Sequence, residues 1–187
     1  MRFGSKVLFD DVTTLFSAGR RYGLTGPNGA GKSTFMKLLT GELPPQKGTT
    51  TRPAKVGVLR QDQFAFDRFR VVDTVIMGNH RLWSALEERE HLYAKPSMTN
   101  EDGMRLGELE ALVGEEDGYT AESDAAILLE GLDIPHDLHE RSMAELQSDQ
   151  KVRVLLAQAL FGHPDALLDL RRRARLTGAF GSVGPPH

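Results

Sequence analysis

The nine residues from Gly26 to Thr34, GPNGAGKST, constrain this chain more than any other stretch. They satisfy the pattern G-x-x-x-x-G-K-[ST], which is typical of a loop that cradles phosphate groups. The flanks agree with the pattern, because residues 20–25 predict a short strand before the loop and residues 33–40 predict a helix after it. Glycines let the backbone turn its N–H groups inward, and the positive end of the helix faces the same point. The stretch therefore predicts a nucleoside-triphosphate site.

The side chains of this loop have separate expected roles. We expect Lys32 to reach the β- and γ-phosphates and Ser33 to offer its hydroxyl to Mg²⁺. The alternative is a glycine-rich turn that carries a lysine by coincidence, and the predicted strand and helix on either side argue against it. The expected ligands are ATP and Mg²⁺, and the expected contact residues are Gly26, Asn28, Gly29, Gly31, Lys32, Ser33 and Thr34.

Composition bounds the class of protein. The 187 residues are 26% charged and 40% hydrophobic, which is near the globular average and disfavours wholesale disorder. A net charge of −3 gives no global basic surface for nucleic acid. The absence of cysteine excludes disulfides and thiolate metal sites. No apolar run is long enough for a membrane span, and the first residues have no signal-peptide core, so we expect a cytoplasmic protein with no membrane partner.

The pattern outside the loop predicts an α/β fold. Short strands are expected at residues 7–9, 12–16, 49–51 and 55–59, and a buried strand at residues 166–169. A polar and aromatic loop over residues 61–69 leads to a helix that begins near Val71. Further helices are expected over residues 122–130 and 150–161, and a disordered tail over residues 171–187.

Residues 79–120 differ in composition from the rest of the chain. They carry ten acidic and four basic side chains, and apolar residues repeat at helical spacing on both sides of Pro96. This predicts two antiparallel helices. The inward-facing residues are expected to be Leu82, Leu86, Leu109 and Leu112. Such a hairpin is either a solvated helical subdomain or an arm for a partner, and charge runs more often mark solvated faces.

With these pieces in order, the chain resembles an ATP-binding cassette, and more narrowly the first cassette of the ABC-F subfamily, in its YbiT-type branch. The resemblance runs from Phe3 to about Asp169. It is carried by FGSKVLFDDV, RYGLTGPNGAGKSTFMKLLTGEL, VGVLRQDQFAFD, TVIMG and KVRVLLAQALFGHPDALL. It implies a P-loop NTPase fold with a helical subdomain and an arm insertion, incomplete at both ends.

The resemblance also implies domains and residue roles. Residues 1–78 correspond to the cassette core, residues 79–120 to the arm, and residues 121–170 to the helical subdomain with the signature helix and a shortened Walker B strand. Phe3 corresponds to the aromatic residue that stacks on adenine, a contact that needs only a π face. Gln61 and Asp169 correspond to groups that support Mg²⁺. The resemblance implies a ribosomal partner for the arm, although its acidity argues against direct phosphate binding.

The signature loop, usually L-S-G-G-Q in cassettes, departs from the family pattern. Here it spans Leu146–Gln150 and reads LQSDQ. Asp149 is chemically suited to be the N-cap of the following helix. If it faced a phosphate, its carboxylate would repel the ligand by roughly 1–4 kcal/mol.

The expected Walker B strand also departs from the pattern. It is one apolar residue short, and Leu170 stands where a catalytic glutamate is usual. A leucine side chain can accept neither a proton nor a hydrogen bond. No switch histidine or second cassette follows Leu170, so we expect a truncated or frame-shifted product with impaired hydrolysis.

Three functions stay open from the sequence. The leading one is an ABC-F-type ATP-binding protein associated with the ribosome. The alternatives are the nucleotide-binding subunit of an ABC transporter and a non-catalytic binding module. Steady ATP turnover would separate an enzyme from a binding module.

Overall fold

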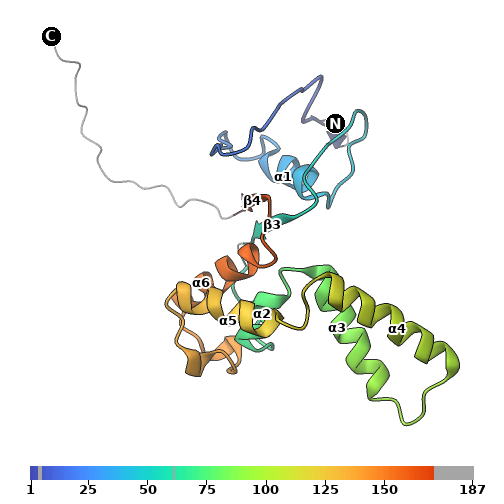
Figure 1. Ribbon diagram of the computed structural model, residues 1–187. Helices are drawn as coiled ribbons and strands as arrows, with labels where there is room; N and C mark the ends of the chain where they lie inside the picture. Colours follow the sequence, from blue (N-terminus) through green and yellow to red (C-terminus); the bar gives the residue numbers. More distant parts are fainter. Residues whose placement is uncertain (4–5, 61, 171–187) are drawn as a thin grey trace.

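The computed structural model describes residues 1–3, 6–60 and 62–170. Figure 1 shows a cluster of helices α2, α5 and α6 on one side of the short strands β3 and β4, with α1 on the other side. Helices α3 and α4 extend away from the cluster as a pair. The predicted tail at 171–187 and the predicted site residue Gln61 lie outside the described residues.

Two short sheets are present in the described part of the chain. Strands β1 (Arg2–Phe3) and β2 (Lys6–Val7) pair in antiparallel fashion. Strands β3 (Val56–Leu59) and β4 (Ala166–Asp169) pair in parallel, with Val56 opposite Ala166 and Leu59 opposite Asp169. The predicted strands at 55–59 and 166–169 are thus confirmed, and they join segments that lie about 110 residues apart. The predicted burial of the second strand is wrong, since Leu167 is 44% exposed.

The strands predicted at residues 12–16, 20–25 and 49–51 are wrong, and the one predicted at residues 7–9 is reduced to the end of β2. These segments have suitable residues but no ladder partner in the described structure, and their apolar side chains stay exposed, Leu15 at 83% and Val12 at 58%. A strand is completed by hydrogen bonds to a neighbouring strand. Local pattern shows that a segment can be a strand, but it does not show that a partner reaches it.

The helices are close to those predicted. Helix α1 spans Lys32–Thr40 and ends at Gly41, whose left-handed backbone caps it and whose N–H donates to the Leu38 carbonyl at 3.3 Å. Helix α2 spans Val71–Ile76, α5 spans Ala121–Gly131 and α6 spans Ser148–Leu160. Single 3₁₀ turns occur at η1 (His136–Leu138) and η2 (Met143–Glu145). Periodicity predicts these helices well because their hydrogen bonds are local.

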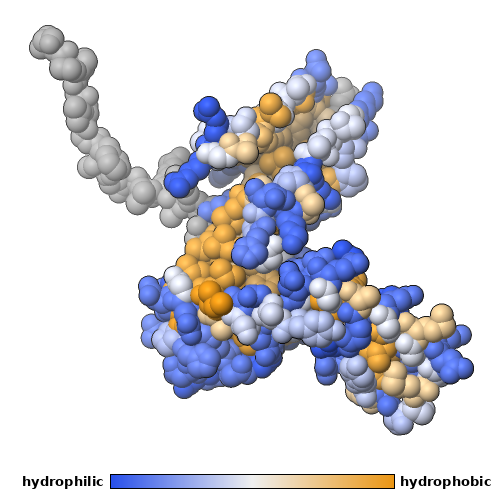
Figure 2. Space-filling view, viewed as in Figure 1, coloured by the Kyte–Doolittle hydropathy of each residue, from blue (hydrophilic) through white to orange (hydrophobic). Residues whose placement is uncertain are grey.

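The main core lies among the helices. Val71, Val75, Ala125, Leu129 and Val154 are fully buried where α2, α5 and α6 meet. Helix α6 also covers one face of β3, where Leu59 packs against Leu155 and Ala159. Figure 2 shows apolar surface that runs from β3 and β4 toward α6, and smaller apolar patches on the α3–α4 hairpin. On the strand pair, Leu167 of β4 is 44% exposed. The central sheet is therefore less covered than the helical core.

The approach of α2 to α6 depends on a glycine. A Cβ atom at Gly78, just after α2, would lie 1.9 Å from the backbone carbonyl oxygen of Gln158 in α6. Close by, the buried Gln158 side chain donates from Nε2 to the Thr74 carbonyl at 2.8 Å. Because the obstacle at Gly78 is backbone, it cannot swing aside as a flexible side chain could.

Gly78→Ala is therefore expected to lower the free energy of unfolding by about 1–3 kcal/mol, since α6 or α2 must shift. Chemical denaturation followed by circular dichroism would measure this. The matched control is Gly103→Ala in α4, where a Cβ would meet nothing within 4 Å. That change is expected to stabilise by roughly 0.5–1 kcal/mol through helix propensity. Equal stability of the two variants would contradict the packing described.

The two helices predicted within residues 79–120 are present. Helix α3 spans His80–Tyr93 and α4 spans Asn100–Glu115, and they lie antiparallel in Figure 1. Thr99 caps α4 in a capping box with Asp102. Leu82 and Leu109 are buried between the helices and the core, and Leu86 and Leu112 are partly buried against it. Arg105 joins the two helices through Glu88 at 2.7 Å.

Candidate nucleotide site

The glycines of the predicted phosphate loop have the backbone that such a loop requires. Gly26, Gly29 and Gly31 all have positive φ, at 151°, 78° and 91°. Side chains other than glycine rarely adopt these values. At Gly31 a Cβ would also lie 3.0 Å from the Phe9 ring. The sequence pattern therefore matches the backbone shape at all three glycines.

The positive end of α1 is open toward this loop. Gly31 caps the helix without a side-chain hydrogen bond, and the first turn carries no acidic residue. Helix N–H groups at such an end favour an anion. Ser33 is exposed in that first turn, so its hydroxyl can face a ligand. The arrangement suits phosphate binding.

Lys32 bends back over the loop that precedes it. Its Nζ donates to the carbonyl oxygens of Gly26 at 2.6 Å and Pro27 at 2.8 Å. Both acceptors are neutral, and Lys32 makes no described ion pair with a carboxylate. A phosphate group would be a stronger acceptor for an ammonium than either carbonyl. Lys32 is thus held close to the cradle by bonds that a phosphate can replace.

The β3–β4 pair brings Asp169 beside the chain that leads to Gln61. Leu59 lies opposite Asp169 in the parallel register, and the N–H of Leu170 donates to the Leu59 carbonyl at 3.0 Å. Gln61 itself lies outside the described residues, two positions beyond Leu59. The carboxyl ends of neighbouring parallel strands are where ligands bind in α/β folds. The register thus places Asp169 at the carboxyl edge of the β3–β4 pair. The predicted roles of Asp169 and Gln61 at Mg²⁺ stay predictions.

The described contacts do not yet join the phosphate loop to that edge. The segment after β3 meets the far end of α1 instead, where Arg60 pairs with Glu42 at 3.1 Å. A cleft of about 390 Å³ lies beside this ion pair, and among the described residues its lining includes none of the predicted site residues. The approach of Lys32 and Ser33 to Asp169 stays a prediction. The same holds for Phe3, whose backbone is in β1 but whose side chain lies outside the described part.

The structure corrects the prediction for Asp149. Helix α6 begins at Ser148, and its N-cap is Gln147, whose N–H donates to the Gln150 side chain at 2.9 Å. Asp149 instead lies in the first turn and pairs with Arg153 at 2.7 Å. The hydrogen bond from Arg153 holds the pKa of the Asp149 carboxyl below its ordinary value. The i,i+4 spacing of the two residues could have indicated this pair. Arg153 thus offsets part of the repulsion expected from Asp149.

Sequence reasoning missed Lys151, also in the first turn of α6. Its side chain is 5% exposed, and its Nζ lies 2.5 Å from a carboxylate oxygen of Asp67. Lysines are almost never buried unless they are paired. The local signal is a lysine at the start of the apolar part of α6, and that pattern does not reveal the partner.

Comparisons with known proteins agree with this geometry. A family model described as "ABC transporter" matches residues 9–169. The chain is 52% identical over 170 residues to "Probable ATP-binding protein YbiT" of Escherichia coli O157:H7, covering 90% of this chain and 32% of that protein. It is 49% identical to the "Uncharacterized ABC transporter ATP-binding protein YkpA" of Bacillus subtilis, with the same coverage. It is 32% identical to "ABC transporter F family member 4" of Arabidopsis thaliana, covering 87% of this chain and 23% of that protein. The chain spans about a third or less of the length of these relatives.

Proposed function

Because this chain belongs to the ATP-binding cassette family, within its ABC-F type, we propose that it binds Mg·ATP at the loop from Gly26 to Thr34. The observation that carries the proposal is the backbone of that loop. Three glycines with positive φ precede a helix whose first turn presents Lys32 and Ser33 without a competing carboxylate. The expected binding groups are the loop N–H groups, the Lys32 ammonium and the Ser33 hydroxyl.

The residues present fit a magnesium ion carried by the nucleotide. Mg²⁺ usually takes one or two protein carboxylates or hydroxyls, with phosphate oxygens and water completing its shell. Ser33, Asp169 and Gln61 would hold it. Phe3 would stack on the adenine ring. Titration calorimetry of the purified chain with Mg·ATP tests this function, and heat no greater than that of dilution would refute it.

The finer proposal is that the α3–α4 hairpin is an arm for a ribosomal partner in the cytoplasm. It is supported by the ABC-F relatives and by the projection of the hairpin from the helical core in Figure 1. The proposed units are residues 1–78 for the cassette core, 79–120 for the arm and 121–170 for the helical subdomain. In the described residues, no helix is both long and apolar enough to cross a membrane.

Co-sedimentation with ribosomes tests this partner. The chain is expected to pellet with ribosomes when a non-hydrolysable ATP analogue is present, because the nucleotide would order the cassette core beside the arm. The Lys32→Ala variant is the control and is expected to stay in the supernatant. Recovery with membrane vesicles and no recovery with ribosomes would instead favour the subunit of a transporter.

A further inference from the structure

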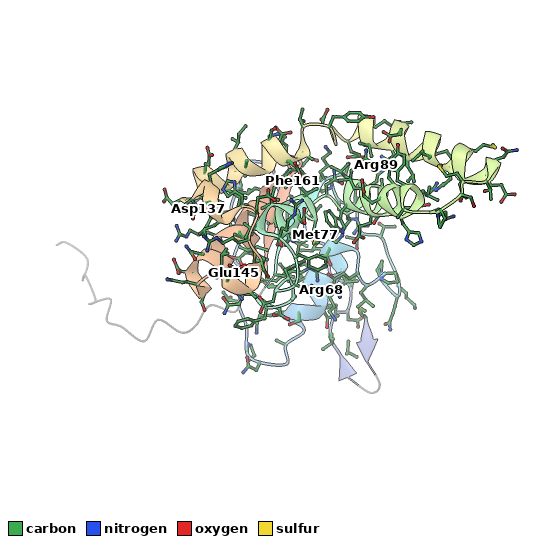
Figure 3. All side chains as sticks on the ribbon, turned by 90° about the horizontal axis from the view of Figure 1, so that it is seen from below. Arg68, Met77, Arg89, Asp137, Glu145 and Phe161 are labelled. Carbon is green, nitrogen blue, oxygen red and sulfur yellow. The ribbon has the colours of Figure 1, made fainter. Side chains whose placement is uncertain are left out.

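The segment directly after Gln61 is attached to the turn that precedes α6. The backbone carbonyl of Asp67 accepts hydrogen bonds from the Ser142 hydroxyl at 2.6 Å and from the Ala144 N–H at 3.2 Å. Two residues later, the Phe69 carbonyl accepts from the Met143 N–H at 2.9 Å. Figure 3 labels Arg68 and Glu145, which follow Asp67 and Ala144 in the chain and mark the two segments. Residues 62–69 and 142–145 are therefore expected to move together, because separating them would break several hydrogen bonds.

Lys151 extends this connection to the signature helix. Its side chain runs from the first turn of α6 to Asp67, where Nζ and Oδ1 lie 2.5 Å apart. The ammonium also lies 4.9 Å from the centre of the Phe64 ring, within range of a cation–π contact. The Lys151 side chain is 5% exposed and that of Asp67 is 38% exposed. One lysine therefore contacts two positions within the 62–69 segment, Phe64 and Asp67.

Stability alone does not explain a buried lysine at this position. The cost of removing two charges from water can exceed their attraction, and hydrophobic replacement is often neutral or stabilising. An unbranched apolar side chain would fill much of the same volume. What the ion pair supplies beyond volume is a fixed partner, because the lysine can satisfy its charge only while Asp67 is in place.

We propose that Lys151 is a positioning residue. Its ion pair with Asp67 makes residues 62–69 and the signature loop Leu146–Gln150 shift as one unit. The inference rests on the proposed function, since it takes Gln61 to be the group that meets Mg·ATP. A change at Gln61 would pass along residues 62–67, through Asp67 and Lys151, to the first turn of α6. In a cassette, the signature loop and the first turn of the helix after it are expected to face the nucleotide of a neighbouring cassette.

The nucleotide-free protein gives the first test. Lys151→Met removes the charge and keeps most of the stem, and Asp67→Asn removes the charge from the other side with little change in shape. Hydrogen–deuterium exchange of the amides in residues 62–69 is expected to accelerate roughly tenfold in both variants. The matched control is Lys95→Met, which breaks the 2.6 Å ion pair with Asp102 in the distant hairpin. Unchanged exchange in Lys151→Met and Asp67→Asn would overturn the proposal.

The second test asks whether the two segments respond together. In the wild type, Mg·ATP is expected to slow exchange in residues 62–69 and also in residues 148–151. In Lys151→Met, calorimetry is expected to give a Kd within about threefold of wild type, while the response at 148–151 is lost. Trp83, the only tryptophan, packs edge-on against Phe69 and reports the 62–69 segment by fluorescence. Lys151→Arg is expected to restore the response at 148–151.

The outcomes separate the two proposals. If Lys151→Met binds Mg·ATP and both segments still respond as in wild type, Lys151 does not couple them and the inference fails. If the wild type gives no binding heat, the proposed nucleotide function fails. The nucleotide-free exchange data then still decide whether the ion pair holds the 62–69 segment in place.

Discussion

Lys32→Ala is expected to remove measurable Mg·ATP binding. Lys32 is the cation fixed at the phosphate loop, and the ligand carries several negative charges. Two unit charges 4 Å apart interact by about 4 kcal/mol at an effective dielectric constant of 20. Losing the larger part of that attraction is enough to raise Kd by about 100-fold. Titration calorimetry of the two proteins side by side measures the difference.

The variant is expected to fold normally, which makes the comparison clean. Lys32 donates to two neutral carbonyl oxygens of an exposed loop, and alanine is the best helix former for the first turn of α1. Lys37→Ala in the last turn of the same helix is the matched control and is expected to keep wild-type affinity. Equal Kd values for wild type and Lys32→Ala would show that the loop is not the phosphate site.

ATP turnover by this chain is expected to be no faster than the Lys32→Ala background. The residue after Asp169 lies at the carboxyl edge of the sheet, where Leu170 donates its N–H to Leu59. The leucine side chain at that position cannot orient or deprotonate water. Loss of a general base lowers rates by about 10²–10⁴-fold. Release of phosphate from saturating Mg·ATP, followed over hours, measures the residual rate.

A clear turnover that depends on Lys32 would contradict this prediction. Asp169→Asn then becomes the informative variant, because Asp169 is the carboxylate that the β3–β4 register brings to the same edge. Loss of turnover with retained binding would identify Asp169 as the base. Binding lost together with turnover would instead indicate that Asp169 supports the magnesium ion.

The elements that the sequence predicted best are those made by local interactions. The loop from Gly26 to Gly31 needs positive φ at three glycines, and α1 to α6 follow from apolar spacing and from caps such as Thr99 with Asp102. The hairpin α3–α4 follows from the same kind of pattern on either side of Pro96. In each case the two partners of a hydrogen bond lie within a few residues of each other, so a short stretch of sequence contains both.

What only the tertiary structure decided depends on partners far apart in the chain. The sequence could not tell that residues 55–59 would find a partner at 166–169 while residues 12–16 and 20–25 would find none among the described residues. It treated Lys151 as one more helical residue, but the fold buries it beside Asp67, 84 positions earlier. By itself the sequence determined the glycine loop and the helices, because their interactions are local, whereas the strand pairs and buried ion pairs were decided by long-range packing.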